Sequence, residues 1–186
     1  MQPRNPWLLT TAVTILIAIS LLLGGCRKNG TADGSMRISS PDFRNMNALS
    51  ARFACDGANL SPELDWSEVP DSAVTLALVV VDPDAPRGDF VHWIIYNIPA
   101  TARGLTRGVP PDADLGGGVY QGMNDFAQLG YDGPCPPPGP PHRYFFRLFA
   151  LDTRLDIPSG ATKEELMAAA LNHVVGEAEL MGTYSR

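Results

Sequence analysis

Three long apolar runs constrain the fold of this chain more than any other feature of its sequence. They read TLALVVVDPD from Thr75, FVHWIIYNIP from Phe90, and HRYFFRLFALD from His142 to Asp152. β-Branched, aromatic and leucine side chains dominate all three, a pattern that suits strands buried on both faces. We therefore expect these runs to form the strands of a central sheet.

Shorter segments extend this expectation to a mostly β domain. MRISS at 36, ARFACD at 51 and LDWSEV at 64 are further candidate strands. Near the end of the chain, Thr162 and Glu165 form a T-x-x-E capping box, and apolar residues recur at helical spacing until Gly176 closes the predicted helix. The following AELMGTYSR fits either a short second helix or an edge strand. The overall expectation is one or two helices packed outside the sheet.

Composition agrees with this architecture and excludes one class of partner. The chain has 186 residues, enough for one domain with a sizeable core, and its 18 Gly and 17 Pro indicate many turns. Residues 101–141 show almost no periodic pattern, and irregular stretches of this length are usually functional or disordered. The net charge of −6 argues against a nucleic-acid partner, which would require a basic face.

The first 35 residues have the pattern of an export and anchoring segment. A basic start precedes an apolar run from Leu8 to Leu23, and Gly-Gly separates that run from Cys26. This ending resembles the bacterial lipobox, in which the cysteine becomes lipidated; an uncleaved anchor and ordinary secretion are the alternatives. We expect residues 1–25 to be a signal peptide, and residues 26–35 to be the lipidated cysteine and a polar tether. The domain at 36–186 would then lie in the bacterial cell envelope, anchored to a membrane on the periplasmic or outer side.

Two cysteines remain once Cys26 is assigned to lipid. Cys55 and Cys135 both lie in turn-like surroundings, ACDGAN and YDGPCPPPG. In an oxidising compartment such a pair favours a disulfide, although two free buried thiols fit the sequence as well.

Asp82, His92 and His142 are the residues best placed for chemistry, each within or beside a predicted strand. DPDAP can be a stiff strand-ending turn with solvated acids, because its two prolines fix the backbone. A two-histidine-one-carboxylate metal site lacks close spacing, and a hydrolase triad lacks a G-x-S-x-G motif. The third option is a small anion pocket, in which imidazoles and the Tyr144 hydroxyl donate hydrogen bonds to a phosphate. His173, in the predicted helix, has the setting of a structural residue.

Three segments together resemble the phosphatidylethanolamine-binding protein family, and especially its bacterial branch labelled Raf-kinase-inhibitor-like. They are ACDGANLSPELDW, LALVVVDPDAPRGDFVHWIIYNIP and GYDGPCPPPGPPHRYFFRLFALD, and the resemblance covers Met36 to Arg186. It implies a central antiparallel sheet packed on a smaller sheet, with C-terminal helices near a small, preformed anion cavity. The ligand-binding positions that it implies are Asp82, His92, Gly133, Pro134, His142 and Tyr144. One departure is local: Pro140 and Pro141 separate Gly139 from His142, where the family has a single residue.

The resemblance implies a binding protein rather than an enzyme. The expected ligand is a phosphate-containing small molecule or a phospholipid head group, with no cofactor, no metal and no catalytic residue. Asp82 would orient a histidine ring, while Asp84 and Asp89 would be solvated or structural. The membrane would be reached only through the N-terminal lipid. The alternative is a protease inhibitor or other protein-interaction module that uses the 101–141 loop, with a protein partner that the sequence does not name.

Overall fold

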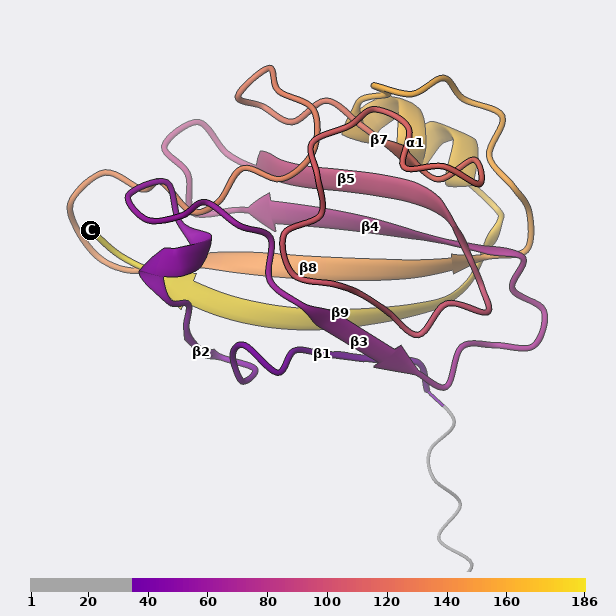
Figure 1. Cartoon of the computed structure of the whole chain (residues 1–186), viewed down its shortest axis with the longest axis horizontal. Helices are drawn as coiled ribbons and strands as arrows, with labels where there is room; N and C mark the ends of the chain where they lie inside the picture. The colour runs from indigo at the N-terminus through magenta and orange to yellow at the C-terminus, as the bar shows by residue number, and fades with distance from the viewer. Residues whose placement is uncertain (1–34) are drawn as a thin grey trace, which may run out of the picture. The chain divides into compact units, whose positions relative to one another are not determined.

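The structure, a computed structural model, describes residues 35–186. The described residues form two sheets, one of three strands in the order β1-β3-β6 and one of six in the order β2-β9-β8-β4-β5-β7 (Figure 1). Within residues 35–186, all strand pairs are antiparallel except β2–β9. The elements are β1 (Arg37–Ser39), β2 (Asn47–Ala48), the 3₁₀ helix η1 (Ala51–Phe53), β3 (Leu64–Ser67), β4 (Thr75–Asp82), β5 (Phe90–Pro99), β6 (Gly104–Leu105), β7 (Tyr120–Gln121), β8 (His142–Leu151), α1 (Lys163–Ala170) and β9 (Val174–Tyr184).

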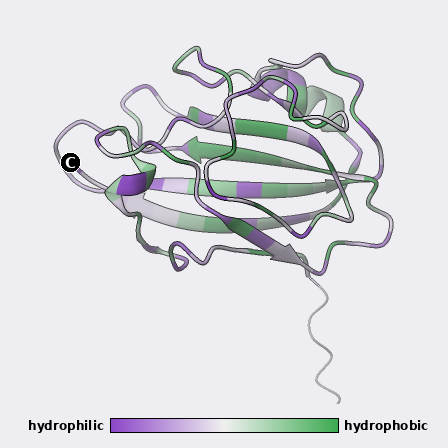
Figure 2. Ribbon diagram, viewed as in Figure 1, coloured by the Kyte–Doolittle hydropathy of each residue, from purple (hydrophilic) through white to green (hydrophobic). Residues whose placement is uncertain are grey.

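The three apolar runs form β4, β5 and β8, as predicted, and they are buried because both faces of the large sheet are covered. Every residue of β4 is buried, and its side chains alternate between two separate cores. Leu76, Leu78 and Val80 face the three-stranded sheet, whereas Ala77, Val79 and Val81 face the side of α1. This double coverage explains the continuous apolar colouring of β4 in Figure 2.

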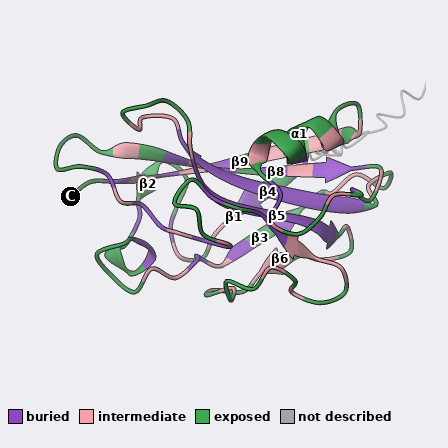
Figure 3. Cartoon of the chain, turned by 90° about the horizontal axis from the view of Figure 1, so that it is seen from above, coloured by how far each residue is buried: buried purple, intermediate pink, exposed green. Residues whose placement is uncertain are grey.

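The two cores lie on opposite faces of the large sheet. Figure 3 shows α1 on one face, with β3 and β6 on the other. The larger core includes Trp66, Trp93 and Phe146, and the smaller one joins Leu166 and Ala170 of α1 to β4 and β5. The central antiparallel sheet packed on a smaller sheet is therefore confirmed.

A β-bulge at His92 interrupts β5. The β4–β5 register passes from Val80↔Trp93 to Val81↔Val91, so His92 has no partner on β4. Residues two apart on a regular strand share a face. Because of the extra residue, Val91 and Trp93 do not: Val91 faces the smaller core and Trp93 faces the larger one. The bulge therefore sets the direction of the His92 side chain at the start of β5.

Two local predictions are wrong. The helix does not continue to Gly176 but ends at Ala170, because Asn172 adopts a left-handed conformation with φ of 68° and the β-branched Val174 and Val175 begin β9. Of the two options for the C-terminal segment, the strand is therefore realised. The second error is ARFACD: residues 51–53 form a 3₁₀ turn, capped by the Ser50 side chain, rather than a strand.

The 101–141 region is as irregular as its sequence indicates, with only β6 and β7 in it. A buried side chain nevertheless holds this irregular region against the large sheet. The Gln121 amide donates to the carbonyls of Pro110 and Asp112 and accepts from Nε1 of Trp93, at 2.7 to 2.8 Å.

The predicted signal peptide, Cys26 and, apart from Ser35, the tether lie outside the described residues. Within residues 35–186, no helix has the length and apolar character needed to cross a bilayer.

Candidate functional site

A small pocket lies where β4 ends and where β5 and β8 begin. Its volume is about 140 Å³. It is lined by Asp82, Ala85, Pro86, Phe90, His92, Phe126, Cys135, Pro136, Pro137 and His142. Three of the six predicted ligand-binding residues, Asp82, His92 and His142, therefore line one pocket, and α1 contributes none of the lining.

Asp82 and His142 form the most buried ion pair of the described residues. Nδ1 of His142 lies 2.8 Å from Oδ2 of Asp82, and their side chains are 12% and 5% exposed. The other carboxylate oxygen accepts from the backbone N–H of Asp84 at 2.8 Å, so the turn itself holds the carboxylate in place. Asp82 contacts the His142 ring at Nδ1, so Nε2 is the ring nitrogen outside this contact.

His92 is held from behind by a backbone carbonyl. Its Nδ1 lies 2.7 Å from the carbonyl oxygen of Asp132, which can only accept, so Nδ1 carries the hydrogen and Nε2 has a free lone pair. Burial lowers the pKa of His92, and the Asp132 carbonyl and the charge of Asp82 oppose this only in part. The neutral ring is therefore favoured in the empty pocket.

Tyr144 lies behind the pocket rather than in its lining. Its ring packs edge-on against His92 with 5.2 Å between centroids, and its hydroxyl is buried without a hydrogen-bond partner among the described residues. Burial, followed by the nearby charge of Asp82, raises the pKa of this hydroxyl. Tyr144 thus supports the His92 ring in this structure.

Gly133 and Pro134 are also buried behind the pocket wall. A side chain at Gly133 would meet the carbonyl oxygen of Phe53 at 1.9 Å, which explains the need for glycine there. Its N–H donates to Oδ1 of Asn59 at 2.8 Å, and the carbonyl of Pro134 accepts from the N–H of Cys55 at 3.1 Å. Both residues therefore hold the wall in place from outside the lining.

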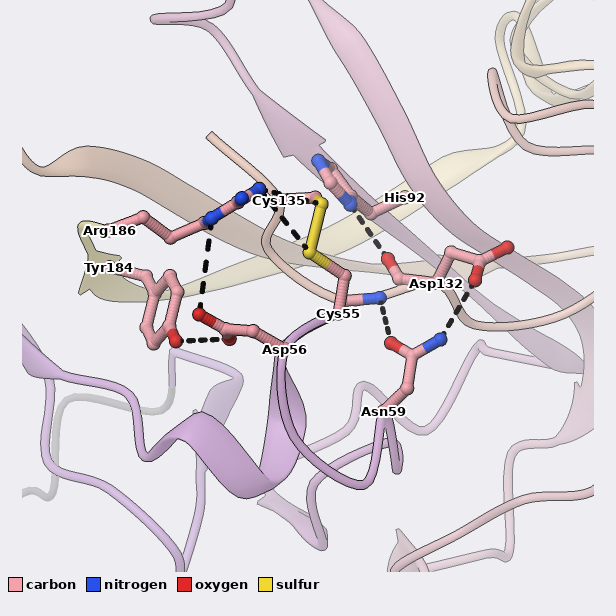
Figure 4. The surroundings of a disulfide bond; sticks show 9 residues. Cys55, Asp56, Asn59, His92, Asp132, Cys135, Tyr184 and Arg186 are labelled. Carbon is pink, nitrogen blue, oxygen red and sulfur yellow. Dashed lines mark hydrogen bonds and ion pairs between the residues drawn. A yellow bond between two sulfur atoms is a disulfide. The ribbon is translucent and has the colours of Figure 1, made fainter. Parts of the chain in front are cut away.

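Cys55 and Cys135 form a disulfide, with 5.4 Å between their Cα atoms. Figure 4 shows it close to the Asn59–Asp132 contact and to His92. Asn59 donates to Oδ1 of Asp132 at 2.9 Å, and Asp132 in turn holds His92. One covalent and several polar links thus tie the segment after η1 to the pocket wall.

Asp84 and Asp89 have structural roles, in line with expectation. Asp84 accepts two hydrogen bonds from the Arg143 guanidinium, at 2.7 and 2.8 Å, and one from the Arg143 N–H. The Arg143 side chain accounts for most of the lowering of the Asp84 pKa to about 2. Asp89 pairs with Lys163 at 3.0 Å. The first pair connects the turn after β4 to the start of β8, and so fixes two walls of the pocket.

Several residues of the site were not identified from the sequence. Asn59 and Asp132 are 73 residues apart, and nothing in their local patterns indicates that they meet. Phe126 closes the pocket at 5.5 Å from the His92 ring, and it is placed there by Asp125, whose carboxylate accepts from the Val91 N–H at 2.7 Å. Such side chains in loops carry no periodic signal.

Other parts of the described chain offer weaker sites. An open hollow of about 630 Å³ lies over β8, β9 and α1, but its Arg147 is already paired with Glu179 at 2.9 Å. Within residues 35–186, no three His, Cys, Asp or Glu side chains are grouped to hold a metal ion.

Comparisons with known proteins agree on one family. The family model described as phosphatidylethanolamine-binding protein matches residues 39–185. A UPF0098 protein of Methanothermobacter thermautotrophicus is 49% identical over 151 residues, covering 81% of this chain and 99% of that protein. The crystal structure of a protein from Chlamydia trachomatis, described as a homologue of phosphatidylethanolamine-binding protein, has a TM-score of 0.75, 37% identity and coverage of 82% of this chain and 99% of that one.

A second crystal structure extends the comparison. The E. coli protein YbcL, described as a new member of the mammalian family, has a TM-score of 0.76 and 32% identity, over 82% of this chain and 99% of that one. The family match spans nearly all the described residues, and both crystal structures share the fold seen here. The chain therefore belongs to the phosphatidylethanolamine-binding protein family.

Proposed function

We propose that this domain is an exported binding protein that holds a phosphate or a phosphoryl head group between His92 and His142. The observation that carries the proposal is the convergence of two imidazoles on one small pocket, each with Nδ1 already bonded to the protein. Nε2 of each ring is the nitrogen available to a ligand, and a phosphoryl group offers several oxygens that can meet both.

The size of the pocket supports a small ligand group. A volume of about 140 Å³ equals the liquid volume of roughly five water molecules. Pockets for whole drug-sized ligands usually exceed about 300 Å³. A phosphate group has five heavy atoms, so the pocket matches the head of a ligand, with any remaining part outside.

The chemistry of the lining supports the binding of an anion. The carboxylate of Asp82 balances the charge of a protonated His142, whose Nε2–H then donates to an anion. The lining includes no serine, threonine or lysine, and its one cysteine, Cys135, is in a disulfide. Covalent catalysis through a serine, threonine, lysine or free cysteine nucleophile is therefore not supplied by these residues.

Export and lipid anchoring belong to the same proposal. Two features support them: the Leu-Gly-Gly-Cys sequence that ends at Cys26, and a disulfide of the kind that persists in oxidising compartments. Metabolic labelling with a fatty acid should mark the wild-type chain and not Cys26→Ala. Equal labelling of both would contradict the anchor.

Histidine NMR tests the pocket. On addition of inorganic phosphate or phosphoethanolamine, the imidazole signals of His92 and His142 should shift. His173 is a matched internal control, because its Nδ1 also lies 2.8 Å from an aspartate, Asp152, but both side chains are nearly half exposed and outside the pocket.

A variant completes this test. His142→Asn should weaken phosphate binding at least about tenfold, since it removes one charge-assisted hydrogen bond. His173→Asn should leave the affinity unchanged. Movement of the His173 signal alone, or equal affinity in both variants, would show that the pocket is not the binding site.

A further inference from the structure

The Cys55–Cys135 disulfide has two unequal sides. Cys55 is exposed, whereas Cys135 is half-buried and lines the pocket. A disulfide opens when an external thiolate attacks one sulfur and the other sulfur leaves as a thiolate. Because Cys55 is the more exposed of the two residues, we take its Sγ as the atom that an incoming thiolate attacks, with Cys135 as the leaving group.

A guanidinium lies beside the leaving sulfur. Nη1 of Arg186 is 3.4 Å from Sγ of Cys135 and 4.0 Å from Sγ of Cys55 (Figure 4). A fixed positive charge stabilises a thiolate, and a more stable thiolate leaves faster. The charge therefore lies on the side of the bond that favours release of Cys135.

Asp56, the acidic residue that follows Cys55 in the chain, is already engaged. Asp56 accepts a hydrogen bond from the Tyr184 hydroxyl at 2.5 Å, and its carboxylate lies 4.0 Å from Nε of Arg186. These contacts offset the negative charge that would otherwise repel an approaching thiolate. Arg186 thus neutralises Asp56 and contacts both sulfurs at once, as Figure 4 shows.

The two cysteine segments are held together by more than their disulfide. The Cys55 N–H donates to the Pro134 carbonyl at 3.1 Å, and the Tyr131 hydroxyl donates to the Phe53 carbonyl at 2.7 Å. Asn59 adds a bond to the Gly133 N–H at 2.8 Å. These contacts would keep two free thiols close to each other, so the bond can open and close within the folded domain.

We propose that Cys55–Cys135 is an exchange-active disulfide, which opens in the folded protein on reaction with an external dithiol. In the first step a thiolate of the dithiol bonds to Sγ of Cys55, and the electron pair of the S–S bond passes to Cys135. In the second step the other thiol of the reagent displaces Cys55. The products are two cysteine thiols and one oxidised dithiol, and one wall of the pocket has changed its chemistry.

Mapping the mixed disulfide tests the direction of attack. The folded full chain is incubated with glutathione, free thiols are alkylated at low pH, and both cysteines are analysed by peptide mass spectrometry. The expected result is glutathione on Cys55 and alkylation on Cys135. Glutathione mainly on Cys135, or no reaction until the protein is unfolded, would overturn the proposal.

Kinetics test the role of Arg186. Arg186→Gln should slow reduction by dithiothreitol roughly threefold to tenfold at low salt, because the leaving thiolate loses its positive neighbour. Arg186→Lys should recover part of the rate, and Arg147→Gln, on the outer face of β8, should react like the wild type. Equal rates for Arg186→Gln and the wild type would refute the assistance by Arg186.

Discussion

At the residue scale, His92 shows how the pocket can respond to an anion without a permanent cation. The lining includes two histidines and Asp82 but neither lysine nor arginine, and burial keeps the pKa of His92 below its ordinary value of 6.5. The charged groups near this ring are the carboxylates of Asp82 and Asp132. An anion in the pocket would stabilise the protonated ring, so binding should be accompanied by uptake of a proton.

Anion affinity should therefore increase as the pH falls from about 8 to about 6, by up to about tenfold per pH unit. Sulfate is the best probe because its own charge is constant in this range. Calorimetry in buffers of different ionisation enthalpy measures the proton uptake directly. In His92→Asn the slope should become shallower, and an unchanged slope would contradict the assignment.

The same pKa shift has the opposite consequence for the empty protein. Since His92 binds a proton less readily in the folded state than in the unfolded state, it contributes stability above pH 6.5. That contribution is lost as the pH falls below 6.5 towards the lowered pKa of the folded state. Proton and anion therefore promote each other's binding at this ring: acid alone destabilises the domain, whereas acid with an anion strengthens the complex.

At the element scale, one buried amide organises the long irregular region. Gln121, on β7, is fully buried and bonds two loop carbonyls and the indole of Trp93. Gln121→Ala removes three hydrogen bonds and leaves buried partners without replacements. We expect it to lower the free energy of unfolding by about 3 kcal/mol, measured by urea denaturation.

Gln128→Ala is the matched control, because Gln128 lies in the same region with an exposed side chain. It should change the free energy of unfolding by less than about 0.5 kcal/mol. If the two variants were equally stable, the loop would not depend on the Gln121 amide.

The elements differ in how far the sequence predicts them. β4, β5 and β8 follow from their apolar runs, because a strand covered on both faces needs no polar alternation. The end of α1 could not be predicted from the sequence, since Leu171 and Val174 continue the helical spacing past the turn at Asn172. The bulge at His92 was also not predicted, because it appears only when β5 pairs with β4.

The site was predictable to a similar degree. Asp82 and His142 stand at the ends of strands that the apolar runs predicted. The family resemblance implied that both residues belong to one pocket, and their side chains are in contact there. Asn59, Asp132 and Phe126 come from loops whose paths depend on tertiary contacts. Their roles could therefore be recognised only from the folded chain.

At the scale of the whole molecule, the disulfide joins residues 80 apart and constrains much of the unfolded chain. Replacement of both cysteines by serine should lower the free energy of unfolding by about 4.5 kcal/mol, according to the loop-entropy model. Small domains have about 5–15 kcal/mol in total, so the variant should still fold. Urea denaturation of the variant and the oxidised wild type measures the difference; equal stability would contradict this expectation.

The bulge at His92 also has a consequence for how this pocket can be lost or gained over generations. A point substitution at position 92 removes an imidazole but keeps the extra residue, so both cores retain their facing side chains. Deletion of His92 would make Val91 and Trp93 neighbours, and neighbours on a regular strand face opposite sides, so both cores would again keep their side chains. The two cores therefore do not depend on the extra residue, and a lineage could lose this pocket by losing one residue while it keeps the rest of the sheet.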